Sequence, residues 1–151
     1  MFQRVSCTRR DLLRGLAAGA ACGAAGCDGG GLMVDGGVSG DGPCTALLCV
    51  SLTNPSNSAL RSIGGAQVFS APNAGPIILI RTDAMTVAAL SDVCTHAGCA
   101  VTYQSGSGQL VCPCHGSVFS ITGQVLRGPA ASPLKVYSAT LDTTTNTIDV
   151  T

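Results

Sequence analysis

Two short segments in the second half of the chain constrain the fold more than any other feature. Residues 94–99 read CTHAGC, and residues 112–117 read CPCHGS. Each segment places a cysteine and a histidine two or three residues apart, and together they hold both histidines of the chain. A short glycine-containing hairpin at residues 106–108 would bring the segments face to face. The pattern predicts two facing loops that offer two thiolates and two imidazoles.

This ligand set suits two kinds of metal site. A structural zinc ion takes four such ligands in a tetrahedron. A mixed-ligand 2Fe-2S cluster takes cysteines at one iron and histidines at the other. The spacing of Cys94, His96, Cys112 and His115 leaves both possibilities open, so the flanking residues must decide between them.

The flanking residues resemble the Rieske family of iron-sulfur proteins. CTHAGC and CPCHGS match the two cluster-binding boxes of that family nearly letter for letter. Residues 128–130 (GPA) and 133–134 (PL) resemble the proline-rich loop that covers its cluster. The resemblance extends over the chain from about residue 60 onward and implies one 2Fe-2S cluster.

The resemblance also implies a role for each site residue. Cys94 and Cys112 would ligate the buried iron. His96 and His115 would ligate the outer iron, with ring edges that reach the surface where a partner docks. Ser117 matches the family serine whose hydroxyl bonds a bridging sulfide. Because imidazoles carry no negative charge, such a cluster accepts an electron more readily than an all-cysteine cluster.

Three further positions place the chain within the family. Cys99 and Cys114 match the cysteines that form a disulfide between the loops in quinol-oxidising Rieske proteins, whereas Rieske ferredoxins of aromatic-ring oxygenases typically lack them. Two buried free thiols are the alternative. Phe119 stands where quinol-oxidising members commonly have a tyrosine that bonds a cysteine ligand. We therefore expect a reduction potential below that of the highest members and above that of the oxygenase ferredoxins.

Residues 1–27 resemble a twin-arginine export signal. Arg9 and Arg10 precede an apolar pair and a further arginine, and an Ala- and Gly-rich stretch follows at residues 16–26. That stretch is short and weakly apolar, as in a signal peptide, whereas a membrane-spanning helix needs about 20 predominantly apolar residues. An amphipathic helix is the alternative. The twin-arginine route exports proteins already folded, which suits a protein whose cluster is assembled in the cytoplasm.

The end of this segment also resembles a lipid-attachment site. Residues 24–27 read AAGC, similar to a lipobox, which implies lipidation of Cys27. Cleavage without lipid and an uncleaved anchor are the alternatives. We expect a protein on the periplasmic side of the membrane, held there by lipid or by an N-terminal anchor.

Residues 28–59 predict a flexible linker. Glycine dominates its first part, together with Asp and Ser, so this part cannot bury enough apolar surface to fold. Cys44 and Cys49 are candidates for a small disulfide-closed turn at the domain entrance, with two free thiols as the alternative.

Residues 60–151 predict an all-β domain. Short β-prone runs such as residues 77–81 (IILIR) and 147–150 (TIDV) alternate with turn residues, and no long amphipathic helix interrupts them. This pattern indicates a β-sandwich or a barrel. The Rieske resemblance narrows it to an antiparallel β-sandwich with a small cluster-binding subdomain formed by the two loops.

The expected function follows from these features. The formal net charge is +0, so there is no basic surplus to hold a phosphate backbone and we expect no nucleic-acid partner. We expect an exported electron carrier without an independent catalytic site, a subunit or partner of a respiratory complex such as a quinol:cytochrome c reductase. Its partner would be a cytochrome, an oxidoreductase large subunit or a membrane quinol. The alternatives are the small subunit of an oxidoreductase of the arsenite oxidase type and a zinc- or disulfide-stabilised binding module.

Overall fold

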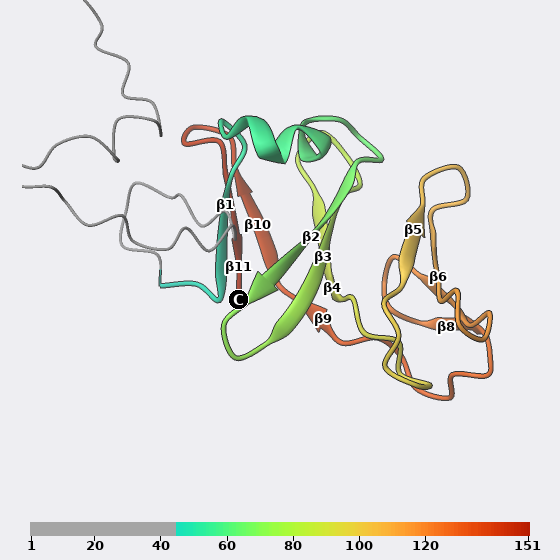
Figure 1. Cartoon of the computed structure of the whole chain (residues 1–151). Coiled ribbons are helices and arrows are strands. Elements are labelled where there is room, and N and C mark those ends of the chain that lie inside the picture. The colour runs from blue at the N-terminus through green and yellow to red at the C-terminus, as the bar shows by residue number, and fades with distance from the viewer. Residues whose placement is uncertain (1–44) are drawn as a thin grey trace, which may run out of the picture. The chain divides into compact units, whose positions relative to one another are not determined.

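The computed structural model describes residues 45–151, which form an antiparallel β-structure with one short helix (Figure 1). The strands are β1 (Leu48–Ser51), β2 (Ala66–Ala71), β3 (Gly75–Arg81), β4 (Val87–Ser91), β5 (Thr102–Gln104), β6 (Gln109–Val111), β7 (Val118–Ser120), β8 (Val125–Arg127), β9 (Val136–Tyr137), β10 (Ala139–Asp142) and β11 (Thr147–Val150). The 3-10 helix η2 (Pro55–Arg61) follows β1. The all-β prediction is confirmed.

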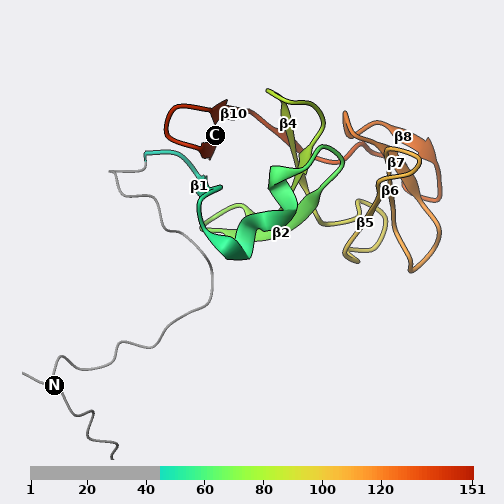
Figure 2. The same cartoon turned by 90° about the horizontal axis from the view of Figure 1, so that it is seen from above.

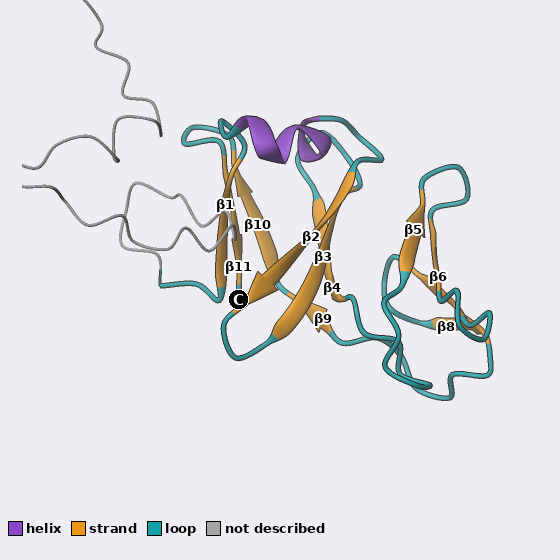
Figure 3. Ribbon diagram, in the orientation of Figure 1, coloured by secondary structure: helices purple, strands orange, loops and turns teal. Residues whose placement is uncertain are grey.

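The strands form three sheets, whose orders are β1-β11-β10, β2-β3-β4-β9 and β5-β6-β7-β8. Figure 3 shows that the first two sheets face each other, while the small third sheet lies to one side. The view from above separates β5 to β8 from β1 and β10 in the same way (Figure 2). We call the first two sheets the base and the segment from Val93 to Leu134, which includes the third sheet, the cluster subdomain.

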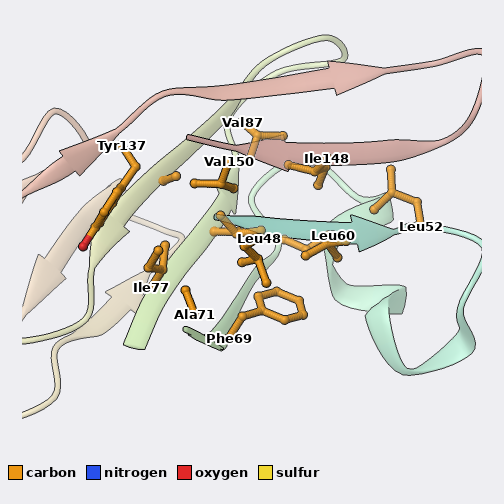
Figure 4. Close-up of a cluster of buried hydrophobic side chains, with 13 residues drawn as sticks. Leu48, Leu52, Leu60, Phe69, Ala71, Ile77, Val87, Tyr137, Ile148 and Val150 are labelled. Atoms are coloured by element: carbon orange, nitrogen blue, oxygen red, sulfur yellow. The ribbon is translucent and has the colours of Figure 1, made fainter. Parts of the chain in front are cut away.

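The core of the base lies between its two sheets (Figure 4). Its buried side chains are Leu48, Val50, Leu52, Leu60, Phe69, Ala71, Ile77, Leu79, Val87, Ala89, Tyr137, Ile148 and Val150. Fully burying a Leu, Ile or Phe side chain contributes about 1.5–3 kcal/mol. This apolar layer is therefore the main source of stability for the sandwich.

Strand β3 is buried on both faces. Ile77 and Leu79 point into the core of the base, and Ile78 and Ile80 belong to a second core beneath the predicted ligand loops. The second core contains Ile78, Ile80, Leu90, Cys94, Val101, Leu110, Cys112, Phe119, Ala130 and Leu134. Because successive side chains of a strand alternate between faces, a continuous run such as PIILI is what a strand between two cores requires.

The folded domain begins earlier than the expected residue 60. Strand β1 pairs with β11, and its Leu48 and Val50 are 3% and 0% exposed. Helix η2 is capped by Asn54, and Arg61 donates from Nε to the carbonyl oxygen of Leu52 at 2.7 Å. The start of residues 28–59 is rich in glycine, so the average composition of this segment predicted a linker. The residues that form β1 lie near its end.

The N-terminal predictions concern residues that the structure does not describe. Arg9, Arg10, Cys27 and Cys44 all lie outside the described residues. Cys49 is disulfide-bonded, and its pairing with Cys44 stays a prediction. Within residues 45–151, no helix has the length and apolar character needed to cross a membrane.

Candidate metal centre

The first ligand loop follows β4 and is closed by local backbone hydrogen bonds. The Cys94 N–H donates to the Cys99 carbonyl at 2.8 Å, and the Gly98 N–H donates back to the Cys94 carbonyl at 2.9 Å. Gly98 has a φ of +75°, a conformation that a residue with a Cβ adopts only with strain. An antiparallel bridge between Val93 and Ala100 joins the two ends of the loop.

The second ligand loop repeats this hydrogen-bond pattern between β6 and β7. The Cys112 N–H donates to the Ser117 carbonyl at 2.8 Å, and the Gly116 N–H donates to the Cys112 carbonyl at 3.0 Å. Gly116 has a φ of +74°. Each loop thus has a cysteine at its start and a glycine four positions later. The chain needs these two glycines because both loops close through the same left-handed turn.

The sulfur side of the site is buried. Cys94 and Cys112 are free thiols, 2% and 1% exposed, and their side chains hydrogen-bond to each other. Burial raises the pKa of Cys94, but hydrogen bonds from the His96 backbone, Cys112, the Ala97 backbone and Ser117 together outweigh it and lower the pKa. These contacts therefore stabilise the thiolate of Cys94 relative to that of an ordinary cysteine, and the thiolate is the form that binds a metal.

The imidazole side of the site is exposed. His96 and His115 both lie at the surface, and their ring centroids are 4.7 Å apart with an interplanar angle of 86°. The structure thus brings together the histidines of the two loops, as expected. It places two thiols inside and two imidazoles outside.

A disulfide ties the two loops together. Cys99 and Cys114 form a bond of 2.03 Å, which confirms the predicted pairing and rules out the alternative of two free thiols. The sulfur of Cys112 lies within 4.8 Å of both. Because Cys99 and Cys114 are bonded to each other, Cys112 is the member of this sulfur group that can offer a thiolate.

The proline-rich segment is bonded to both loops. Ser117 is fully buried, and its hydroxyl oxygen accepts from the Ala130 N–H at 3.0 Å. Thr95 donates from Oγ1 to the Ser132 carbonyl at 2.6 Å. The Gly128–Pro129 peptide bond, in the same segment, is cis. The resemblance predicted a covering segment here, but it did not single out Thr95 or Ser132.

Sequence reasoning also missed two charged residues beside the loops. Asp92, two residues before Cys94, is 6% exposed, and its Oδ1 has no hydrogen-bond partner within residues 45–151. Burial raises the pKa of this carboxyl, and a hydrogen bond from the Val101 backbone lowers it in part. Arg127 donates from Nε to the Gly116 carbonyl at 3.2 Å. Asp92 and Arg127 stand among uncharged residues in the sequence, and this is the feature by which they could have been found.

Comparison with known proteins identifies the site. The profile of the Rieske [2Fe-2S] domain matches residues 57–138, more than half of the chain. The chain belongs to the Rieske family. Its cofactor is therefore one 2Fe-2S cluster, and the alternative of structural zinc is set aside. The donors fit this cluster, because the two loops supply two buried free thiols, Cys94 and Cys112, and two imidazoles that lie next to each other.

The similar proteins include iron-sulfur subunits of cytochrome b6-f complexes. The cytochrome b6-f complex iron-sulfur subunit of Synechococcus sp. (strain JA-3-3Ab) is 45% identical over 65 residues, which cover 43% of this chain and 38% of the relative. The subunit of the same name from Chlorobaculum thiosulfatiphilum is 37% identical over 79 residues, 52% and 42% of the two chains. The chain thus spans less than half the length of these curated relatives.

A solved structure supports the fold assignment. The plasma membrane Rieske protein PetC3 from Synechocystis PCC 6803 superposes with a TM-score of 0.52 at 35% sequence identity. The superposition covers 58% of this chain and 86% of that protein.

Removing the disulfide should destabilise the protein. The two cysteines are 15 positions apart in the sequence, and a disulfide that closes a loop of that size is expected to contribute about 3 kcal/mol to stability. A double Cys99→Ala/Cys114→Ala variant removes this crosslink. Denaturant unfolding followed by circular dichroism measures the loss. A Ser105→Ala/Ser107→Ala variant, altered at exposed positions of the same subdomain, is the control and should match the wild type. Equal unfolding free energies for all three proteins would contradict the expected role of the bond.

Proposed function

We propose that this chain is an exported electron carrier that works with a quinol-oxidising cytochrome complex. The observation that carries the proposal is the division of the site into buried thiols and exposed imidazoles. When bound, a 2Fe-2S cluster takes up and releases one electron. Cys94 and Cys112 would hold the buried iron, and His96 and His115 the outer iron.

The surrounding residues suit this role. Hydrogen bonds from the His96 and Ala97 backbone and from Ser117 reach the sulfur of Cys94, where they stabilise negative charge and favour reduction. The bonds from Ala130 and Thr95 hold the proline-rich segment against the loops. The histidine edges stay open to solvent, so a donor or acceptor can approach within electron-transfer distance.

Three observations support the proposed partner and location. The similar proteins include cytochrome b6-f complex iron-sulfur subunits, so a cytochrome or a membrane quinol is the partner we propose. A disulfide between the loops persists in an oxidising compartment. The arginine pair and the AAGC sequence support export to the periplasmic side and a lipid anchor on Cys27.

The ligand assignment predicts which variants lose the cluster. Cys94→Ala and His115→Ala should each abolish the EPR signal of the reduced protein and its visible absorption, because each removes one of the proposed ligands. Metal analysis should find iron and no zinc in the wild type. Val93→Ala, next to the first ligand, is the control and should keep both signals. A wild-type protein that contains zinc and gives no EPR signal would refute the proposal.

Phe119 should limit the reduction potential. This ring is fully buried in the same core as Cys94 and Cys112. In Phe119→Tyr, a hydroxyl could donate a hydrogen bond to a cysteine ligand and raise the potential by about 40 mV, the electrical equivalent of a net hydrogen bond. Potentiometric titration monitored by EPR measures the change. Tyr103→Phe, which removes a hydroxyl from the same subdomain, should leave the potential unchanged. A potential unaffected by Phe119→Tyr would argue against this explanation.

Export should depend on the arginine pair. An Arg9→Lys/Arg10→Lys variant should stay in the cytoplasm with its cluster, whereas the wild type reaches the periplasmic side. Cell fractionation and immunoblotting distinguish the two locations. A Cys27→Ala variant should be exported but lose its association with membranes. Unchanged export of the double-lysine variant would count against the twin-arginine route.

A further inference from the structure

The cluster subdomain carries very little charge. If the histidines are left aside, Arg127 is the one charged residue between Val93 and Leu134. The side-chain carboxylates of residues 45–151 belong to Asp83, Asp92, Asp142 and Asp149, outside that segment. Asp92 adjoins the segment but is buried. The exposed surface around the ligand loops thus has a positive charge and no carboxylate of its own to oppose it.

Arg127 lies beside the second ligand loop. It is exposed at the end of β8, and its Nε donates to the carbonyl of Gly116, the residue that follows His115. A Cβ placed on Gly116 would lie 4.0 Å from the terminal nitrogen Nη2 of Arg127. The guanidinium is therefore held against the loop that carries an exposed imidazole.

Most of the guanidinium remains available. An arginine side chain has five N–H groups, and Arg127 uses the one on Nε for Gly116. No carboxylate of the described residues pairs with it. A guanidinium binds a carboxylate through two parallel hydrogen bonds, and one already held in place loses less conformational entropy on doing so.

We propose that Arg127 anchors a docking surface, formed with His96 and His115, for a redox protein with carboxylates around its own electron-transfer site. The inference rests on the proposed electron-transfer function and adds the charge of the partner. A carboxylate paired with Arg127 would bring the partner beside His115. Because no carboxylate of the subdomain opposes the approach, the attraction also orients the encounter.

An anionic lipid surface is the less favoured partner. A basic residue near such a surface contributes about 1 kcal/mol, and stable association needs several of them. The subdomain offers one. In contrast, one well-placed charge at a protein interface changes the rate of association and its salt dependence measurably.

Electron-transfer kinetics test the proposal. The reduced full-length protein is mixed with a basic c-type cytochrome and, separately, with the same cytochrome after succinylation of its lysines. The wild type should reduce the acidic form faster at low salt. Arg127→Gln should slow that reaction about fivefold, as expected for the loss of a surface ion pair. The difference should shrink when salt rises from about 0.01 M to about 1 M, because the screening length falls about tenfold.

Matched variants isolate the local charge. Arg127→Lys keeps the charge and should retain most of the rate with the acidic cytochrome. Arg81→Gln removes one positive charge from β3 in the base and should not change the preference between the cytochromes. The reduction potential of every variant is measured, since a change in driving force would affect both cytochromes alike.

Three results would overturn the docking surface. The first is that Arg127→Gln slows the reduction of both cytochromes equally after correction for the potential. The second is that it slows the reduction of neither. The third is Arg127-dependent binding to phosphatidylglycerol vesicles without a preference between the cytochromes. The last would indicate a lipid surface. If the wild type has no EPR signal or reduces neither cytochrome, the electron-transfer function itself fails, which separates the two proposals.

Discussion

Burial of strand β3 on both faces is the constraint on which the rest of the structure depends. Ile77 and Leu79 hold the sandwich together, while Ile78 and Ile80 form the floor beneath the ligand loops. The same four consecutive residues therefore stabilise the base and support the site. Because Cys94 and Cys112 belong to the second core, the position of their sulfurs is coupled to the packing of the sandwich.

The site has a buried side, which stabilises negative charge, and an exposed side, which is accessible from solvent. The buried sulfur of Cys94 accepts hydrogen bonds from backbone N–H groups and a hydroxyl, which stabilise negative charge away from water. The imidazoles lie outside, where a partner can reach them. Both arrangements come from the same two loops, since each begins with an inward cysteine and continues to an outward histidine. Local backbone geometry thus decides which atoms are hidden and which are accessible.

The all-β class could be predicted from the sequence, because short strand-like runs have local causes. The Cys99–Cys114 bond could be predicted only through the resemblance to the Rieske family, since it joins two separate loops. The start of the domain could not be predicted, because β1 pairs with β11, which follows it about one hundred residues later in the sequence. The bond from Thr95 to Ser132 likewise joins segments whose proximity only the tertiary fold determines.

The two loops share one hydrogen-bonded frame but place their histidines at different steps along it. His96 is two residues after its cysteine, and His115 is three residues after its own. The backbone hydrogen bonds are therefore the same in both loops, but the positions of the histidines are not. The two imidazole rings are nearly perpendicular to each other. Only the second frame has an arginine bonded to its glycine. The two histidines therefore lie in different surroundings, so a molecule that approaches the site meets a different surface at each of them.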